Sequence, residues 1–377
     1  RGSVATRINA QGLIENVASG QSRLDYPLID GVQKGCPHHI LEPSRTNLIT
    51  YSEDFSQSYW IKASVSLSSN QLISPDGTLN SDKIIESSTN GLQQIYSDVI
   101  TTTPSSDYVY SIFIKKGERS WVKVMTANNS GANFNVENGI IGIVDSGVNA
   151  EIEDYGNGWF KCSVSFNTSV SADRVYVRIS TSNGVTSYQG DGTSGVYIFG
   201  AMLEAGSYPT SYIPTNGTAV TRSAETANGA GNSTTFNDSE GVLMAEISAL
   251  ADDLTTREIS ISDGSLSNTI AFMYSPSANN FRFLVRASGT TYVDINIILT
   301  DITISNKVAF KYKENSFSTF INGFELGSDN SGLVPTGNVL NELSFTRSSD
   351  RAFYGKTKQL QYFDSILDSQ QLEQLTS

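Results

Sequence analysis

Paired acidic residues are the first groups in this sequence that could do chemistry. The segment 151–154 reads EIED, and the alternation of an extended strand places Glu151 and Glu153 on one face. Two carboxylates flanking a glycosidic bond are sufficient for its hydrolysis. No third acid follows in the alternation, and acidic strand ends are common on exposed surfaces. We therefore predict no catalytic residue and keep glycoside hydrolysis as an alternative.

Histidine and cysteine give weaker signals. His38 and His39 are adjacent, so they would point to opposite sides of an extended chain, and no other metal ligand follows at a compatible spacing. We interpret them as two loop histidines. The two cysteines, Cys36 and Cys162, are too few for a disulfide scaffold and fit a reducing compartment. The sequence contains no glycine-rich phosphate loop and no Gly-x-Ser-x-Gly motif.

Aromatic residues suit a binding role better, because a sugar needs an aromatic plane and a few polar groups around it. In the segment 121–125, Trp121, Lys123 and Met125 share one strand face, and the lysine indicates that this face is open. The competing interpretation places Trp121 in a core. For Trp159, which follows a turn, we favour a structural role at a sheet edge. The candidate glycan-binding residues are Trp121, Lys123, Tyr155 and Arg347.

Composition excludes several classes of function. The chain has 377 residues, 38% of them hydrophobic, and a net charge of −13. It has no basic stripe of the kind that phosphate backbones require, so we predict no nucleic-acid partner. No apolar run approaches the roughly 20 residues that span a bilayer, so we predict no membrane insertion.

Period-two alternation dominates the sequence and predicts an all-β fold. In residues 174–179, 281–286 and 307–312, every second residue is a large apolar one, and Gly- and Asn-rich turns separate such runs. Many short strands with this punctuation are typical of antiparallel sandwiches. The one predicted helix is short and C-terminal, with Asp368 as N-cap and Gln371 as its capping-box partner.

We predict two β-sandwich domains in tandem. A polar, glycine-rich break at 215–237 separates them. The predicted boundaries are an N-terminal leader or connector at 1–45, a first sandwich at 46–222, a linker at 223–237 and a second sandwich at 238–377. Since the chain begins Arg1-Gly2-Ser3 without methionine, further N-terminal sequence is an open possibility.

The segment 41–60, LEPSRTNLITYSEDFSQSYW, has no regular period. We interpret it as a structural clasp between the leader and the first sandwich. Arg45 would pair with Glu42 or a nearby carbonyl, and Asn47 would close a turn. Phe55 and Trp60 would enter the core, so we predict that Arg45 and Trp60 are largely buried.

Several spaced motifs in 5–222 together resemble a module that recurs in bacteriophage virion proteins. They are LEPSRTNL (41–48), YSEDF (51–55) with Trp60, PDGT (75–78), SIFIKKGE (111–118), EDYGNGWFKC (153–162), GDGTSG (190–195), LEAG (203–206) and PTSYIP (209–214). The fold implied by this resemblance is a jelly-roll sandwich like those of carbohydrate-binding modules.

The second half resembles a concanavalin A-like, laminin G-type domain. The matching segments are VAFKY (308–312), STFINGFEL (318–326), GKTKQLQYF (355–363) and LDSQQLEQL (367–375). Lectins of this fold often bind calcium through loop residues. Asp263, Asp329 and Asp350 are of the right type, but no spacing selects among them, so a structural calcium ion is an expectation without a site.

Together the two resemblances imply a non-enzymatic fibre or receptor-binding protein on the virion surface. It would recognise host surface polysaccharide through sites of weak individual affinity, and repeated copies of these sites would raise the overall avidity. It would contact other virion proteins and form a homo-oligomer, most often a trimer. The alternatives are a decoration protein that binds only virion proteins, and a tailspike-type polysaccharide depolymerase.

Overall fold

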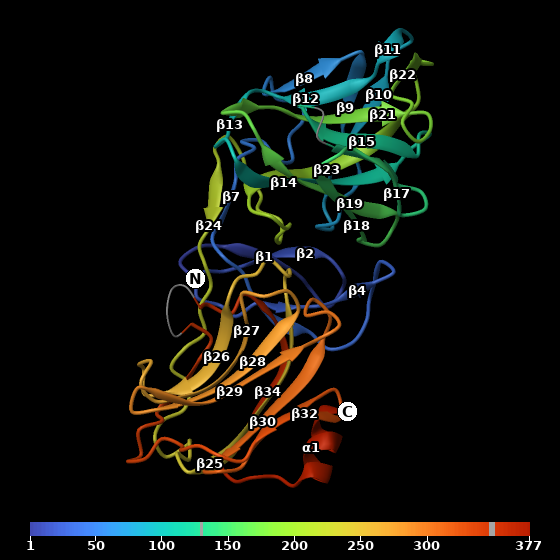
Figure 1. Ribbon diagram of the computed structural model, residues 1–377. Coiled ribbons are helices and arrows are strands. Elements are labelled where there is room, and N and C mark those ends of the chain that lie inside the picture. The colour runs from blue at the N-terminus through green and yellow to red at the C-terminus, as the bar shows by residue number, and fades with distance from the viewer. Residues whose placement is uncertain (129–130, 347–350) are drawn as a thin grey trace. The chain divides into compact units, whose positions relative to one another are not determined.

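The computed structural model describes residues 1–128, 131–346 and 351–377. The chain divides into two compact units, the first made of 1–37 with 44–223 and the second of 38–43 with 224–377. Both units are built from antiparallel sheets, and one short helix is present among the described residues (Figure 1). The predicted all-β class, with β-sandwich sheets and a C-terminal helix, is confirmed.

The first unit contains two six-stranded sheets. One has the order β18 (Val148–Asp154), β19 (Trp159–Thr168), β14 (Ser106–Lys116), β23 (Gly195–Ala205), β10 (Leu79–Glu86) and β9 (Val65–Ile73). The other has the order β17 (Ile140–Val144), β16 (Gly131–Asn135), β15 (Trp121–Thr126), β21 (Val175–Ser180), β12 (Gln94–Ser97) and β8 (Trp60–Ala63).

Alternating side chains join the two sheets into a sandwich. Val122 and Val124 of β15 and Val177 of β21 meet Ile112 and Val164 of the opposite sheet in one fully buried cluster. The neighbours of these residues along each strand point to the outer faces. The alternation that predicted the strand at 174–179 is therefore confirmed, because Val175, Val177 and Ile179 are all buried.

Short strands complete the first unit. They are β1 (Ala5–Ile8) with β2 (Ile14–Val17), β4 (Leu28–Ile29) with β5 (Val32–Gln33), β7 (Arg45–Asn47) with β24 (Val220–Arg222), β11 (Asn90–Leu92) with β22 (Ser187–Gln189), β13 (Ile100–Thr101) with β20 (Ala172–Asp173), and β3 (Leu24–Asp25). Within 1–37, β1 and β2 form an antiparallel hairpin.

The second unit is also a two-sheet sandwich. One sheet contains β6 (His38–Leu41), β34 (Gly355–Phe363), β25 (Glu240–Ala249), β30 (Asn306–Lys313), β31 (Phe317–Ile321) and β32 (Phe324–Asp329). The other contains β29 (Thr290–Ile298), β28 (Asn280–Ala287), β27 (Thr269–Tyr274), β26 (Arg257–Ser262) and β33 (Glu342–Ser344). Leu243, Phe272, Phe283 and Phe310 lie in the core between them.

The helix α1 (Ser369–Thr376) begins as the sequence predicts. The Asp368 side chain accepts from the backbone N–H of Gln371, whose own side chain accepts from the backbone of Asp368. Leu372 is buried against Val242 and Phe320. The helix lies beside β30 and β32 (Figure 1). In the described part of the chain, no helix has the length and apolar character of a membrane span.

The first 43 residues are shared between the units. Residues 1–37 belong to the first, whereas 38–43 supply β6 to the second, where His39 lies opposite Thr357 of β34. The interpretation of His38 and His39 as loop residues is therefore wrong. In the segment 223–237, Ala227 and Ala230 form backbone hydrogen bonds with Phe345 and Leu343 in the second unit.

Candidate functional site

The outer face of the sheet that contains β15 and β21 gathers aromatic and cationic side chains. On β15, Val122 and Val124 point into the core, so Trp121 and Lys123 point outward. On β21, Tyr176 and Arg178 point outward for the same reason. Trp121, Lys123, Tyr176 and Arg178 are all partly exposed, which makes this face accessible. We call it the open face.

Strand register aligns polar groups across the open face. Arg178 lies opposite Lys123 on one side and Gln94 on the other, and Lys123 lies opposite Asn133. Neighbouring strands are about 4.8 Å apart, so this row crosses four strands over about 14 Å. Asn133 is 1% exposed and its amide donates to the Ile143 carbonyl at 3.1 Å, so the accessible donors of the row are Lys123, Arg178 and Gln94.

Two tyrosines lie beside this row and form the next outward-facing pair along β12 and β21. The rings of Tyr96 and Tyr176 stack with centroids 4.8 Å apart and an interplanar angle of 21°. The guanidinium of Arg174 lies 5.6 Å from the Tyr96 centroid, and that of Arg178 lies 5.6 Å from the Tyr176 centroid. The four planar groups form a ladder whose ring faces are occupied, so it offers ring edges and polar groups to a ligand.

The three cations of the open face differ in their partners. Lys123 forms an ion pair with Asp145 at 2.8 Å, and Arg174 lies 3.6 Å from Asp98. Arg178 donates from Nε to Oε1 of Gln94 at 2.6 Å, and no acidic side chain in the described ranges forms an ion pair with it. Burial lowers the pKa of Arg178.

Trp121 borders the row on the side away from the tyrosines. Its register partners are Ser180 and Asn135. Gly142 of β17 lies against it, since a Cβ atom there would be 2.7 Å from the indole ring and 2.3 Å from Oδ1 of Asn183. Asn183 Oδ1 accepts from the backbone N–H of Ile143, which holds the 181–185 turn beside the indole. Close packing at Gly142 therefore fixes one border of the open face.

The structure brings together two of the four predicted glycan-binding residues. Trp121 and Lys123 share the open face, whereas Tyr155 lies in the turn between β18 and β19. There its ring packs edge-on against Phe113 at 4.8 Å, next to a second apolar cluster. The structure separates Tyr155 from the pair because β18 and β19 belong to the other sheet. Arg347, and Asp350 among the calcium candidates, lie outside the described residues.

Sequence reasoning missed Gln94, Tyr96, Arg174, Tyr176 and Arg178 as site residues. A signal for two of them was present. Once Val175, Val177 and Ile179 are assigned to the core, the intervening Tyr176 and Arg178 must face outward. The pairing of β12 with β21, which adds Gln94 and Tyr96, joins segments about eighty residues apart and leaves no local pattern.

The predicted clasp residues lie at the start of the first sandwich. Asn47 is fully buried, donates to the carbonyls of Ala201 and Ile213, and accepts from the N–H groups of Ile49 and Leu203. These bonds use the full capacity of the amide. Asn47 therefore connects β7 to β23 and to the segment after it.

Phe55 and Trp60 enter the same core, and the burial predicted for Trp60 is confirmed, because it is 1% exposed. Their rings are 4.8 Å apart, and the indole N–H donates to the Tyr51 carbonyl. The Arg45 side chain remains 17% exposed and lies 3.6 Å from Glu204. Arg45 Nη1 also donates to the Ser44 carbonyl at 3.3 Å, so the expected nearby carbonyl partner is present, and Glu204 takes the place of Glu42 as the acidic partner.

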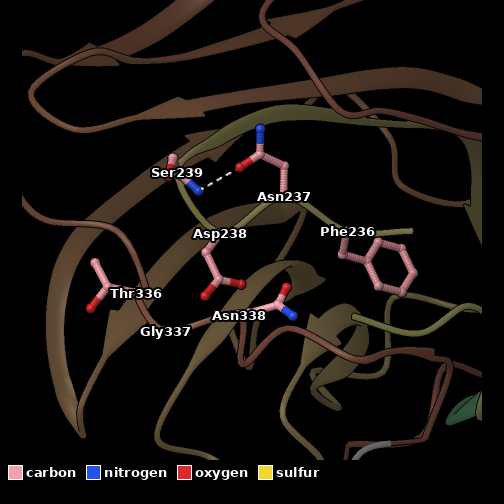
Figure 2. A pocket seen from close by; sticks show the side chains of 7 residues that line it. All are labelled: Phe236, Asn237, Asp238, Ser239, Thr336, Gly337 and Asn338. Atoms are coloured by element: carbon pink, nitrogen blue, oxygen red, sulfur yellow. Dashed lines mark hydrogen bonds between the residues drawn. The ribbon is translucent and has the colours of Figure 1, made fainter. Parts of the chain in front are cut away.

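A pocket of about 400 Å³ lies in the second unit (Figure 2). Its lining residues are Phe236, Asn237, Asp238, Ser239, Thr336, Gly337 and Asn338. The Asp238 carboxylate accepts from the backbone N–H groups of Val339 and Leu340. The Asn237 side chain accepts from the backbone N–H of Ser239 and donates to the Asp364 carbonyl. These polar groups anchor the surrounding loops, so the pocket is a weaker candidate than the open face.

The carboxylate pair on β18 does share one face. Glu153 lies 3.4 Å from Lys161, and partial desolvation together with the charge of Glu153 raises the pKa of Glu151. Within the described ranges, no three His, Cys, Asp or Glu side chains form a group that could hold a metal ion.

Neither the family models nor the curated proteins searched match this sequence. Among solved structures, the chain is similar to the Ruminococcus gnavus sialidase module CBM40 bound to α2,3-sialyllactose, at 15% identity and TM-score 0.33 over 40% of this chain and 94% of that one. It is similar to domains LG4–5 of the mouse laminin α1 chain at 10% identity and TM-score 0.27, over 75% of this chain and 88% of that one. It is similar to a pentraxin from Limulus polyphemus at 13% identity and TM-score 0.30, over 37% of this chain and 70% of that one. Because these TM-scores lie below 0.5, the similarities identify neither a family nor a ligand.

Proposed function

We propose that this chain is a non-enzymatic glycan-binding protein and that the open face of its first unit is the binding site. One observation carries the proposal: strand register places Trp121, Lys123 and Arg178 side by side on an accessible sheet surface. An aromatic border beside a row of donors suits a ligand rich in hydroxyl groups. The site is shallow, so a single contact is weak and several copies bind together.

The direct test is a glycan array probed with the wild-type chain and with matched variants. Trp121→Ala and Lys123→Ala should each reduce the array signal about tenfold, the loss expected for one good contact. The control is Lys356→Ala, which removes an exposed lysine on β34 of the second unit. Absence of binding to every glycan by the folded wild-type protein would refute the proposal.

We further propose, from the sequence resemblance, that the chain is a fibre or receptor-binding component of a phage virion. In this role it would act outside the cell after assembly in the host cytoplasm, and it would form a homo-oligomer, with a trimer favoured. Light scattering would measure the oligomeric state, and binding to whole bacterial cells would test the receptor role. Binding to virion proteins without any glycan binding would favour the decoration role instead.

The depolymerase alternative rests on the geometry of Glu151 and Glu153, which share one face of the edge strand β18, where desolvation and the charge of Glu153 raise the pKa of Glu151. It predicts that the protein releases new reducing ends from host polysaccharide and that Glu151→Gln stops the release. If no reducing ends form while glycan binding persists, the non-enzymatic assignment holds.

A further inference from the structure

We infer that the ligand of the open face is an acidic glycan and that its carboxylate or sulfate group binds between Arg178 and Lys123. This inference rests on the proposed function and adds the chemical class of the sugar.

The first argument is the position of the two cations. Arg178 and Lys123 are direct register partners on neighbouring strands, and both side chains point outward. Like charges directly opposite each other in an antiparallel pair destabilise the sheet. An oxyanion between them would convert this repulsion into two attractive contacts.

The second argument is incomplete neutralisation. Asp145 forms an ion pair with Lys123 at 2.8 Å, but it is the one acidic partner that this cation pair has among the described residues. The Arg178 guanidinium is half-buried, and Gln94 accepts only from its Nε. The two terminal nitrogens of a guanidinium match the two oxygens of a carboxylate or sulfate.

The third argument concerns the rest of the ligand. Gln94 continues the row beyond Arg178, the Tyr96–Tyr176 ladder lies on one side of this row, and Trp121 lies on the other. Because the ring faces of the ladder are occupied, it contacts a ligand through edges and hydroxyl groups. The charged pair therefore supplies the main attraction, and Trp121 supplies the apolar contact with a sugar ring.

The net charge sets a limit on the ligand. The whole chain carries −13, so a polymer with dense negative charge is repelled at long range. A sugar chain with an isolated anionic group per repeat fits better, because its attraction to the open face is local. Binding should weaken as salt concentration rises, since the contact is partly exposed.

The experiment uses an array of paired glycans that differ by a single carboxylate or sulfate, with carboxyl-reduced and desulfated counterparts. We expect the acidic member of the bound pairs to give at least a tenfold stronger signal. The carboxylate and sulfate arms distinguish the two sources of the oxyanion. Tryptophan fluorescence provides a solution measurement, because Trp60 and Trp159 are buried and Trp121 is partly exposed.

Two substitutions separate charge from geometry. Arg178→Gln should remove the preference for the acidic member, whereas Arg178→Lys should keep part of it, because the charge stays and the planar fork is lost. Asp145→Asn, which removes the competing acid, should strengthen acidic binding a few-fold. Thermal unfolding of each variant, with Lys356→Ala as control, establishes that the protein is folded.

The outcomes distinguish the inference from the proposed function. Equal binding of acidic and neutral members, with loss on Trp121→Ala, would overturn the inference and leave glycan binding intact. Binding of no glycan at all would overturn both. A preference for acidic members that survives Arg178→Gln in a folded protein would also overturn the placement of the anion.

Discussion

The two outer faces of the first sandwich differ in how they meet solvent. On the β14–β19–β23 sheet, Phe113, Trp159 and Phe199 point outward and are buried in a cluster with Ile14 of the leader strand β2. The open face of the opposite sheet carries partly exposed tyrosines and cations instead. An apolar outer face is thus covered by the chain itself, whereas a polar and aromatic one is left accessible to ligands.

Two arginines of the first unit, Arg119 and Arg178, show a similar contrast between a group used for structure and a group available to a ligand. Arg119 binds the fully buried Glu86 carboxylate through two hydrogen bonds of 2.9 and 2.6 Å, and Tyr188 adds a third of 2.7 Å. Arg178 on the open face has an amide as its partner. The first arginine belongs to a completed structural network, and the second retains donors for a ligand.

The largest expected effect is that of Trp159→Ala on the covered face. Its indole is 2% exposed and donates to the Ile73 carbonyl at 3.0 Å. The free energy of unfolding should fall by about 3–5 kcal/mol, the usual cost of deleting a buried aromatic ring. Because Trp60, Trp121 and Trp159 all lie in the first unit, denaturation followed by tryptophan fluorescence reports on that unit. The matched variant Trp121→Ala should lose about 1 kcal/mol or less, and equal losses would remove the contrast between the faces.

Next in size is Ile14→Ala in the leader. Ile14 is 7% exposed and is the buried residue that β2 adds to the covered cluster. Truncation should cost about 2 kcal/mol, at the lower end for a buried isoleucine, because the cavity lies near the surface. The same denaturation measurement tests this. A change below about 0.5 kcal/mol would mean that the leader does not stabilise the sheet beneath it.

Arg119→Gln should cost about 2 kcal/mol, since it leaves the buried Glu86 without its cation. Burial alone would raise the pKa of Glu86, but hydrogen bonds from Arg119 and Tyr188 outweigh it, and the pKa lies below the usual 4.5. A carboxyl group with a lowered folded-state pKa stabilises the protein above pH 4.5, and this contribution is lost as pH falls further. The variant should therefore show a weaker loss of stability in acid, measured by unfolding at pH 3–6. An unchanged acid profile would exclude this pair as its source.

The sequence predicts the parts of this molecule that depend on near neighbours. Alternation identified β21, β28 and β30, and the capping box placed the start of α1 at Asp368. The contacts that join distant segments could not be predicted this way. Arg45 pairs with Glu204 rather than Glu42, and His39 lies on a strand because β34 pairs with it. Such pairings depend on topology, which short-range periodicity does not encode.

The same limit applies to the candidate site. Trp121 and Lys123 were identified because both lie on one strand, and two residues fix a face. Tyr155 was grouped with them by residue type alone, and the structure places it against Phe113 on the other sheet. Arg178 completes the row only through the register of β15 with β21.

Arg178→Gln should have the smallest effect on stability, and it tests the contrast between the covered face and the open face most directly. The substitution removes a half-buried guanidinium that has no acidic partner in the described ranges, and it relieves the repulsion with Lys123. The loss of the contacts with Gln94 and Tyr176 opposes this gain. Because these two effects oppose each other, the free energy of unfolding should change by no more than about 0.5 kcal/mol. A loss near that of Arg119→Gln, measured by the same denaturation experiment, would show that Arg178 stabilises the sheet and is not held ready for a ligand.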